Sequence, residues 1–265
     1  MPTPDWLGLA DKLAVITGGA GGIGRACATS FIEAGCGVAL LDRDEAAVTA
    51  FAAELSAQGA RAFGLGCDIA DEGSVRAAAA TVAERMGTPD VLVNNAGILR
   101  PGPLESLTAE AWNAVLGVNL TGYLYCAQAF GAAMRARKAG AIVHIASIAA
   151  SNPQPRSGAY SASKAGVAIL SRQIAFEWGP DGIRSNIVSP GLVRTPMSEA
   201  FYQAPGVAER RAALVPLRRV AGPQDIADAV VFLASARAGY VTGAEILVDG
   251  GVDQILMDQI PRPGF

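Results

Sequence analysis

The sequence predicts an α/β domain, a doubly wound parallel sheet with helices on both of its faces. Short apolar runs alternate with longer helical patterns along the chain, which is typical of βαβ units. The apolar runs are also nearly continuous, as expected for strands that are covered on both sides. The length of 265 residues suits one such domain, so we assign residues 1–265 to it.

Seven apolar runs are the expected strands, and alanine-rich helical segments lie between them. The runs cover residues 13–17, 37–41, 62–65, 91–94, 141–146, 185–188 and 246–248. Because strands and helices alternate without a repeat or a low-complexity linker, the sequence predicts one continuous sheet.

The segment 191–223 is the least regular part of the chain. It carries four prolines, Pro196, Pro205, Pro216 and Pro223. A long irregular segment in a compact domain is often a lid over a site, and a plain surface connection is the alternative. A tail of residues 252–265 follows the last expected strand.

Composition argues against several classes of protein. Apolar residues make up 51% of the chain, which is enough for a large core. The net charge of −3 and the isoelectric point near 5.3 argue against a nucleic-acid binder, which normally presents a basic face. The N-terminus has no signal-peptide pattern, and no stretch is apolar enough to span a bilayer. We therefore expect a cytoplasmic protein without nucleic-acid or membrane partners.

Cysteine and histidine usage argues against metal and hydrolase chemistry. The four cysteines have no paired spacing, so the sequence predicts neither a disulfide framework nor a zinc site. The single histidine, His144, lies in an apolar run that reads as a buried strand. We expect a hydrogen-bonded core histidine there rather than the base of a Ser-His-Asp hydrolase.

A glycine-rich run, residues 17–24, follows the first expected strand and precedes a helix that includes residues 26–31. Glycines let a backbone approach a pyrophosphate, and a helix N-terminus supplies amide donors. Two spacings fit the run equally well: Gly19, Gly21 and Gly24 fit G-x-G-x-x-G, whereas Gly18, Gly22 and Gly24 fit G-x-x-x-G-x-G. No Gly-Lys-Ser/Thr follows, so a P-loop is not supported. The run predicts a Rossmann-type dinucleotide site.

An acid, Asp42, ends the second expected strand, eighteen residues after Gly24. An acid near this position can hydrogen-bond the ribose hydroxyls of NAD, and it would repel the extra phosphate of NADP. The neighbouring Arg43 softens that preference, so we favour NAD without excluding NADP. The alternative is that Asp42 caps the following helix.

Tyr160 and Lys164 lie four residues apart, which places both on one face of a helix. A free tyrosine titrates near ~10, and a cation beside it favours the phenolate. Such a pair is suited to proton transfer. The alternative for an isolated pair of this kind is an ordinary surface contact.

These motifs together resemble the short-chain dehydrogenase/reductase family, from about residue 9 to residue 251. The matching motifs are Thr17-Gly-x-x-x-Gly-Ile-Gly24, Asp68, Asn94-Asn95-Ala96-Gly97, Asn119, Ser147, Tyr160-x-x-x-Lys164, Pro190-Gly191 and Val248-Asp249-Gly250-Gly251. The resemblance implies an NAD-dependent alcohol dehydrogenase or ketoreductase.

The resemblance also implies catalytic roles. Tyr160 would exchange a proton with the substrate oxygen, and Ser147 would hydrogen-bond that oxygen. Lys164 would lower the pKa of Tyr160 and hold the nicotinamide ribose, while Asn119 would support a water chain from Lys164. Two oxygen donors independently suit a carbonyl that gains negative charge. Ser147 and Asn119 could otherwise be capping residues.

Cofactor contacts follow from the same resemblance. The implied residues are Gly18, Gly22, Ile23 and Gly24 at the pyrophosphate, Asp42 and Arg43 at the adenosine ribose, Asp68 and Ile69 at the adenine, Asn95, Ala96 and Gly97 as a floor, and Pro190, Gly191, Val193 and Thr195 at the nicotinamide. Tyr160 and Lys164 would also touch the cofactor. No metal is expected.

The sequence also predicts which residues face the substrate. The residues expected to face it are mainly apolar: Ser147, Ile148, Ala149, Asn152, Gln154, Leu192, Met197, Phe201 and Tyr202. Arg100, Arg156 and Arg194 lie near enough in sequence to be considered, but none has a clear carboxylate-binding position. We expect a neutral, fairly hydrophobic secondary alcohol or ketone, cyclic or aromatic. The alternatives are a 3-oxoacyl thioester reductase, a polyol dehydrogenase, a lyase or isomerase on the same fold, and a non-catalytic NAD-binding regulator.

The resemblance further implies a homotetramer. Alanine-rich helical segments at 127–136 and 165–176 carry more apolar surface than one domain needs. The tail beyond Gly251 carries Ile255, Leu256, Ile260 and Phe265, and two outcomes are open for it. It either crosses the oligomer interface to a neighbouring pocket or frays.

Overall fold

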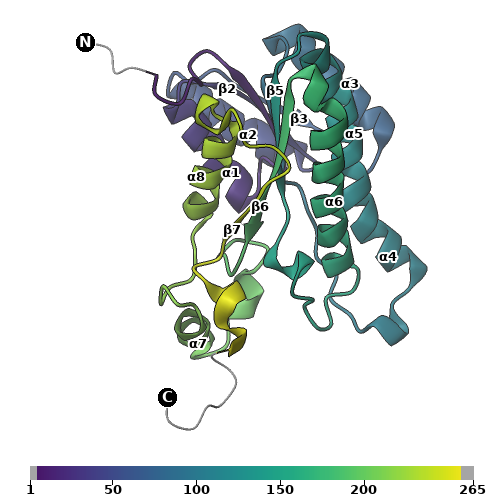
Figure 1. Ribbon diagram of the computed structural model, residues 1–265, viewed down its shortest axis with the longest axis vertical. Coiled ribbons are helices and arrows are strands. Elements are labelled where there is room, and N and C mark those ends of the chain that lie inside the picture. Colours follow the sequence, from purple (N-terminus) through teal and green to yellow (C-terminus); the bar gives the residue numbers. More distant parts are fainter. Residues whose placement is uncertain (1–4, 258–265) are drawn as a thin grey trace.

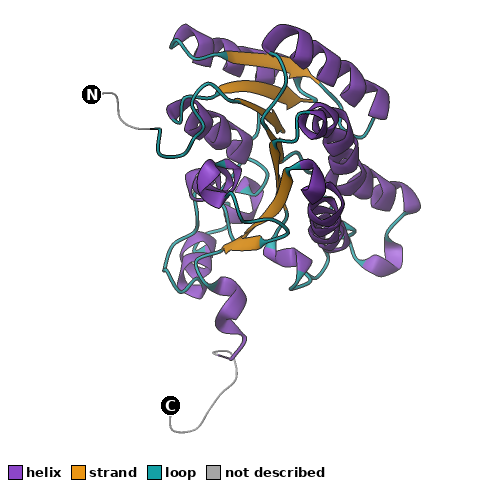
Figure 2. Cartoon of the chain, turned by 45° about the horizontal axis from the view of Figure 1, so that its top comes forward, coloured by secondary structure: helices purple, strands orange, loops and turns teal. Residues whose placement is uncertain are grey.

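A single parallel sheet forms the centre of the protein in the computed structural model, which describes residues 5–257. Its seven strands run in the order β3-β2-β1-β4-β5-β6-β7, with helices packed on both faces (Figure 1). Figure 2 shows the twisted sheet as a layer between two groups of helices. The predicted doubly wound α/β fold is confirmed.

The seven strands lie where the apolar runs predicted them. They are β1 (Leu13–Thr17), β2 (Gly37–Asp42), β3 (Ala62–Gly66), β4 (Val91–Asn94), β5 (Gly140–Ile145), β6 (Ile183–Pro190) and β7 (Glu245–Val248). The inner strands are almost wholly buried, as a sheet covered on both faces requires. The edge strands β3 and β7 are only partly buried, because each has one neighbouring strand.

Eight α-helices accompany the strands within residues 5–257. They are α1 (Gly22–Glu33), α2 (Glu45–Ala57), α3 (Glu72–Met86), α4 (Ala109–Leu116), α5 (Gly122–Ala136), α6 (Tyr160–Trp178), α7 (Val207–Leu214) and α8 (Pro223–Ala234). Short polar side chains begin several of them: Asp44, Asp71 and Thr108 accept hydrogen bonds from backbone amides in the first turns of α2, α3 and α4. No helix in this described part of the chain is long and apolar enough to cross a membrane.

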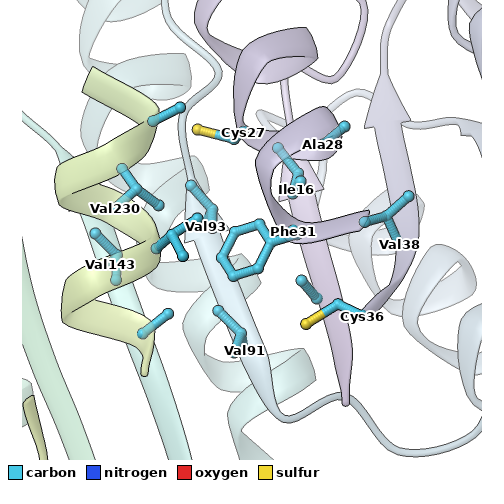
Figure 3. Packing of buried hydrophobic residues seen from close by; sticks show 14 of the residues in the cluster. Ile16, Cys27, Ala28, Phe31, Cys36, Val38, Val91, Val93, Val143 and Val230 are labelled. Atoms are coloured by element: carbon cyan, nitrogen blue, oxygen red, sulfur yellow. The ribbon is translucent and has the colours of Figure 1, made fainter. Parts of the chain in front are cut away.

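Two apolar cores lie on opposite faces of the sheet. Helices α1, α2 and α8 cover one face, and α3, α5 and α6 cover the other. Alternate residues of the strands pack into one core or the other, because successive side chains point to opposite faces of the sheet. Phe31 of α1 fills the first core beside Val93 of β4 and Val230 of α8 (Figure 3). The four cysteines are buried and unbonded to one another.

The strand order reverses between β1 and β4, and the loops that follow these two strands are tied together. The Thr17 hydroxyl accepts hydrogen bonds from the amides of Asn95 (3.0 Å) and Ala96 (3.1 Å). The Asn95 side chain donates in return to the carbonyls of Thr17 and Gly18. In open α/β sheets, ligands bind at such a switch point, beyond the carboxyl ends of the strands.

Backbone hydrogen bonds join the two ends of the irregular segment 191–223. Ala221 donates its amide to the Leu192 carbonyl, and Arg194 donates to the Ala221 carbonyl. The segment contains α7 and a short 3₁₀ helix, Glu199–Tyr202, so it is more helical than its prolines predicted. Another 3₁₀ helix, Val252–Met257, begins the tail. The rest of the tail, including Ile260 and Phe265, lies outside the described residues.

His144 belongs to a buried polar chain in the centre of the sheet. Its two ring nitrogens lie 3.2 Å from the Asn94 amide and 3.2 Å from the Ser185 hydroxyl, which itself lies 2.9 Å from the Ser171 hydroxyl. Burial lowers the pKa of His144 to about 3, so the ring is neutral in the folded protein. The predicted core histidine is confirmed.

We expect the free energy of unfolding to depend on pH through His144, the single histidine of the chain. The unfolded ring takes up a proton near pH ~6.5, whereas the folded ring does not above about 3. The contribution of His144 to the free energy of unfolding is therefore fully present above pH ~6.5, and it is lost progressively as the pH falls from there toward about 3. From pH 7.5 to 5.5 the wild type should lose about 1 kcal/mol more than His144→Gln in urea unfolding. Equal pH dependence would show that the folded ring is protonated.

Candidate active site

A cavity of about 410 Å³ opens at the carboxyl ends of the strands, over the switch point between β1 and β4. Loops that follow β1, β2, β3, β4, β5 and β6 all contribute to its wall. A cavity of this size lies within the ~300–1,000 Å³ range of small-molecule sites. The sequence motifs from distant parts of the chain therefore meet at one place.

The glycine loop forms the wall beside the N-terminus of α1. Gly18 has φ +67°, and a Cβ there would lie 2.8 Å from both the Ala96 Cα and the Asn95 Nδ2. Gly21 caps α1 without a side-chain hydrogen bond, and the first turn contains no acid. The amide-rich end of a twelve-residue helix is thus open toward the cavity, which suits an anionic phosphate.

The structure separates the two glycine spacings. Gly18 and Gly22 line the cavity, whereas Gly19 packs beneath it, where a Cβ would lie 2.9 Å from the Leu40 Cβ. Gly24 does not line the cavity, contrary to its expected contact with the pyrophosphate. A Cβ on Gly24 would lie 2.1 Å from the Gly18 carbonyl oxygen, so this glycine allows the loop and helix to pack closely.

Asp42 lies at the end of β2 and holds the glycine loop. Its Oδ2 accepts a hydrogen bond from the Ala20 amide (3.0 Å), and its Oδ1 accepts one from the Asp44 amide (3.1 Å). The cap of α2 is Asp44, which accepts from the Ala47 amide, so Asp42 is not the helix cap. Asp42 and the exposed Arg43 both line the cavity.

The other expected cofactor residues also reach the cavity wall. They are Ile23, Asp68, Ile69, Asn95, Ala96, Gly97, Pro190, Gly191, Val193 and Thr195. Thr195 and Pro196 lie directly over the glycine loop, because a Cβ on Gly22 would meet both at 3.2–3.3 Å. The loop after β6 therefore packs against the first residue of α1 at the edge of the cavity.

Tyr160, Ser147 and Lys164 meet at the cavity. Tyr160 is the first residue of α6, and Ser147 follows β5. Lys164 is 3% exposed, and its Nζ donates to the Ile145 carbonyl (2.8 Å) and lies 5.7 Å from the centroid of the Tyr160 ring. The first turn of α6 thus carries phenol and amine to the same wall, as their spacing predicted.

Burial dominates the electrostatics of this group. It raises the pKa of Tyr160, and a hydrogen bond from Ser147 partly offsets that rise. Burial also lowers the pKa of Lys164 to about 7. The phenol is therefore protonated at neutral pH, and the expected lowering of the Tyr160 pKa by Lys164 does not outweigh burial.

Asn119 lies behind the cavity in a π-helical turn, Gly117–Thr121, between α4 and α5. Its side chain is fully buried. Its Oδ1 accepts from the Ile98 amide (2.8 Å), and its Nδ2 donates to the Ile98 carbonyl (3.0 Å) and the Ser163 hydroxyl (3.1 Å). Asn119 therefore joins the loop after β4 to α6, and single π-helical turns often occur at functional sites.

Tyr123 is a buried neighbour of the site that the motifs did not indicate. Its hydroxyl donates to the Ile145 carbonyl (3.3 Å) and accepts from Lys164 Nζ (3.5 Å). The amine also lies 5.3 Å from the centroid of the Tyr123 ring. Lys164 thus has oxygen and aromatic partners inside the core, which partly compensate for its burial.

Six of the nine residues expected to face the substrate line the cavity: Ser147, Gln154, Leu192, Met197, Phe201 and Tyr202. Ile148 and Ala149 do not, because the chain turns into a 3₁₀ helix directly after Ser147. Asn152 also lies away from the wall, where its side chain hydrogen-bonds to Asp253.

Arg211 of α7 lines the cavity, although none of the sequence motifs indicated it. Of the three arginines considered from the sequence as carboxylate-binding residues, Arg100 and Arg156 do not line the cavity. Arg194 is held by Glu199 through two hydrogen bonds of 2.8 and 3.0 Å. Arg211 lies far from the motifs in sequence and reaches the site only through the fold of segment 191–223.

Known proteins resemble this chain over nearly its whole length. A family model described as Enoyl-(Acyl carrier protein) reductase matches residues 18–253. D-threitol dehydrogenase of Mycolicibacterium smegmatis is 41% identical over 241 residues, which cover 91% of this chain and 92% of that protein. Cis-4-hydroxycyclohexanecarboxylate dehydrogenase of Sinomonas cyclohexanicum is also 41% identical, over 91% of this chain and 96% of the relative.

A solved structure shares the fold closely. The gluconate 5-dehydrogenase of Burkholderia cenocepacia, in complex with NADP and tartrate, superimposes with a TM-score of 0.89 at 33% identity. The match covers 94% of this chain and 97% of that one.

The close contact at Gly18 gives a testable prediction. We expect Gly18→Ala to weaken binding of the reduced nicotinamide cofactor, NADH or NADPH, at least about tenfold in a fluorescence titration, because the added Cβ displaces the loop from Ala96 and from its place at the cavity. Gly59→Ala is the matched control. Gly59 also has a positive φ, +88°, but nothing lies within 4 Å of its added Cβ. Equal binding by both variants would remove Gly18 from the cofactor site.

Proposed function

The chain belongs to the short-chain dehydrogenase/reductase family, and on that premise we propose that it interconverts a secondary alcohol and a ketone with NAD(H) as the hydride carrier. The observation that carries the proposal is the meeting of Tyr160, Ser147 and Lys164 at the cavity wall. Apolar and aromatic side chains surround this polar group, as in a site that receives a small organic molecule.

Tyr160 is the proposed acid and base. Because burial raises its pKa, the phenol carries a proton at neutral pH and can give it to the oxygen of a ketone. In the opposite direction the phenol first loses its proton to solvent, and the phenolate then accepts the proton of the alcohol. Ser147 supplies a second hydroxyl to the same oxygen and stabilises the negative charge that develops there.

Lys164 is the proposed partner of Tyr160. Its amine, with a pKa near 7, can change its charge at neutral pH. It is fixed by the Ile145 carbonyl beneath the cavity, close to the phenol ring. Asn119 positions the loop after β4 and α6 relative to each other, so it keeps this amine and the floor at Gly97 in place.

The nicotinamide cofactor would supply the hydride. The fit of the site to a dinucleotide rests on the bare glycine backbone at Gly18 and the uncapped N-terminus of α1. We propose that Gly18, Gly22 and Ile23 hold the pyrophosphate, and that the loop after β6 holds the nicotinamide. Asp68 and Ile69 then lie where the adenine is bound.

NAD is the proposed cofactor because Asp42 places a carboxylate at the end of β2. That carboxylate can accept hydrogen bonds from ribose hydroxyls and repels a 2′-phosphate. Arg43 is adjacent and has the charge to compensate for such a phosphate, and the gluconate 5-dehydrogenase relative was solved with NADP. The preference for NAD is therefore expected to be moderate rather than absolute.

A cyclic or polyol-like secondary alcohol is the proposed substrate class. The similar proteins include dehydrogenases named for threitol and for a hydroxycyclohexanecarboxylate. Leu192, Met197 and Phe201 supply an apolar wall to this cavity, and Gln154 supplies an amide. A purely regulatory NAD-binding role is less well supported, because such a role does not need Ser147 and Tyr160 together.

We also propose that the chain assembles as a homotetramer. Helix α6 presents Ile169 and Phe176 to solvent, with the Phe176 side chain 87% exposed. Apolar surface of this kind on a long helix suits a second copy of the chain. Light scattering on the purified protein would measure the assembly directly.

The role of Tyr160 predicts a separation of binding from turnover. We expect Tyr160→Phe to bind NADH as the wild type does, because the ring is retained. Its turnover should fall by about 10²–10⁴-fold with the loss of the acid and base. NADH formation from a panel of cyclic, aryl and aliphatic secondary alcohols is the measurement. Turnover by the variant at the wild-type rate would remove Tyr160 from this role.

The cofactor preference is tested at Asp42. We expect Asp42→Ala to lower the ratio of kcat/KM for NAD to that for NADP by roughly tenfold, since both the ribose hydrogen bond and the repulsion are lost. Asp44→Ala is the control, because it removes the cap of α2 but no carboxylate from the cavity wall. An unchanged ratio in Asp42→Ala would limit Asp42 to holding the glycine loop.

A further inference from the structure

Arg211 presents an uncompensated positive charge at the cavity wall. Among residues 5–257, no carboxylate lies within ion-pair distance of its guanidinium, and no hydrogen bond is formed by its side chain. The guanidinium is instead held by aromatic faces, 4.7 Å from the centroid of the Tyr202 ring and 5.4 Å from that of Phe201. These contacts orient the cation and leave its N–H groups available.

Tyr202 supplies a second unused donor at the same place. Its side chain is 8% exposed and lines the cavity. Within the described part of the chain, its hydroxyl has no hydrogen-bond partner. A buried hydroxyl without a partner is uncommon and costs stability, so such an atom in a cavity wall points to a missing ligand.

The charges around the cavity are divided between its two sides. Asp42 and Asp68 follow β2 and β3, on the side assigned to the adenosine. On the other side, beyond β6, no acid lines the cavity among the described residues, and Glu199 of the neighbouring 3₁₀ helix has both oxygens bonded to Arg194. Among the described residues beyond β6 that line the cavity, Arg211 is the one charged side chain.

We propose that Arg211 and Tyr202 form a subsite for a carboxylate, so that the substrate is a hydroxy acid or the corresponding oxo acid. This proposal rests on the function proposed above and names the substrate class of the same site. The planar guanidinium matches the two oxygens of a carboxylate, and the Tyr202 hydroxyl adds a third donor. One cation suits a monoanion. The apolar wall of Leu192, Met197 and Phe201 then surrounds the carbon frame between the carboxylate and the reacting carbon.

The position of Arg211 is fixed by the base of its segment. After α7, the Leu217 amide donates to the Gly250 carbonyl, and Val215 packs against Gly250, where a Cβ would lie 2.5 Å away. The end of α7 is therefore held against the turn after β7. A subsite built on this helix has a defined place relative to Tyr160, which is a condition for selecting substrates by length.

The first test compares cis-4-hydroxycyclohexanecarboxylate with its carboxamide, which has nearly the same shape and no charge. We expect the wild type to prefer the acid in kcat/KM by at least about tenfold. Arg211→Gln should lower kcat/KM for the acid by roughly 10- to 100-fold, mainly through KM, and leave the amide within about twofold. Tyr202→Phe keeps the ring beneath Arg211 and should affect the acid alone.

Arg210→Gln is the matched control, because Arg210 is an exposed neighbour on the same helix that does not line the cavity. It should leave both substrates unchanged, and Arg211→Lys should recover part of the loss. Equal use of acid and amide by the wild type, or equal loss on both in Arg211→Gln, would overturn the subsite.

A binding measurement separates this proposal from the proposed function. Cyclohexanecarboxylate and benzoate are monoanions that carry no hydroxyl or ketone to react, and their binding to the NADH-loaded protein is measured by calorimetry. We expect at least one to bind and to lose affinity in Arg211→Gln, even if no alcohol in the panel is turned over. If none binds, the subsite is rejected while turnover of neutral alcohols still supports the dehydrogenase.

Discussion

The site depends on the placement of one amine, that of Lys164, inside the core. Burying a charged group is costly, and here the cost appears as a pKa near 7 instead of the usual value near 10.5. The Ile145 carbonyl at the end of β5 and the Tyr123 hydroxyl receive the amine. This contact joins α6 to the carboxyl end of the sheet, and the first turn of α6 then brings Tyr160 to the cavity. A site built on a helix and a strand holds its groups more firmly than one built on loops.

The same region shows how a polar network is made compatible with a buried sheet. His144, Asn94 and Ser185 lie on three neighbouring strands, and the two ring nitrogens of His144 pair with the Asn94 amide nitrogen and the Ser185 hydroxyl. The neutral ring of His144 stacks on Tyr123, with the centroids 5.9 Å apart, and thereby supports the phenol that contacts Lys164. Contacts between polar and aromatic side chains thus run from His144 in the sheet interior through Tyr123 to Lys164 at the cavity.

Much of the fold could be predicted because it follows from local patterns. Continuous apolar runs identified all seven strands, and the spacing of Tyr160 and Lys164 placed both on one helix face. The sequence could not choose between the two glycine spacings. Gly18 faces the cavity and Gly19 faces Leu40, and this difference depends on the folded loop rather than on residue type. Arg211 escaped prediction for a related reason: its side chain reaches the cavity through the closure of segment 191–223 and its contact with Gly250. Such long-range contacts leave no periodic signal in the sequence.

An isotope measurement tests whether hydride passes directly between the carbinol carbon of the substrate and the nicotinamide. A secondary alcohol that is a substrate is labelled with deuterium at the carbinol carbon and incubated with NAD and the protein. We expect the deuterium to appear on the nicotinamide ring of the NADH formed, with a slower rate than for the unlabelled alcohol. Deuterium released to water, or product formed without NADH, would contradict direct hydride transfer.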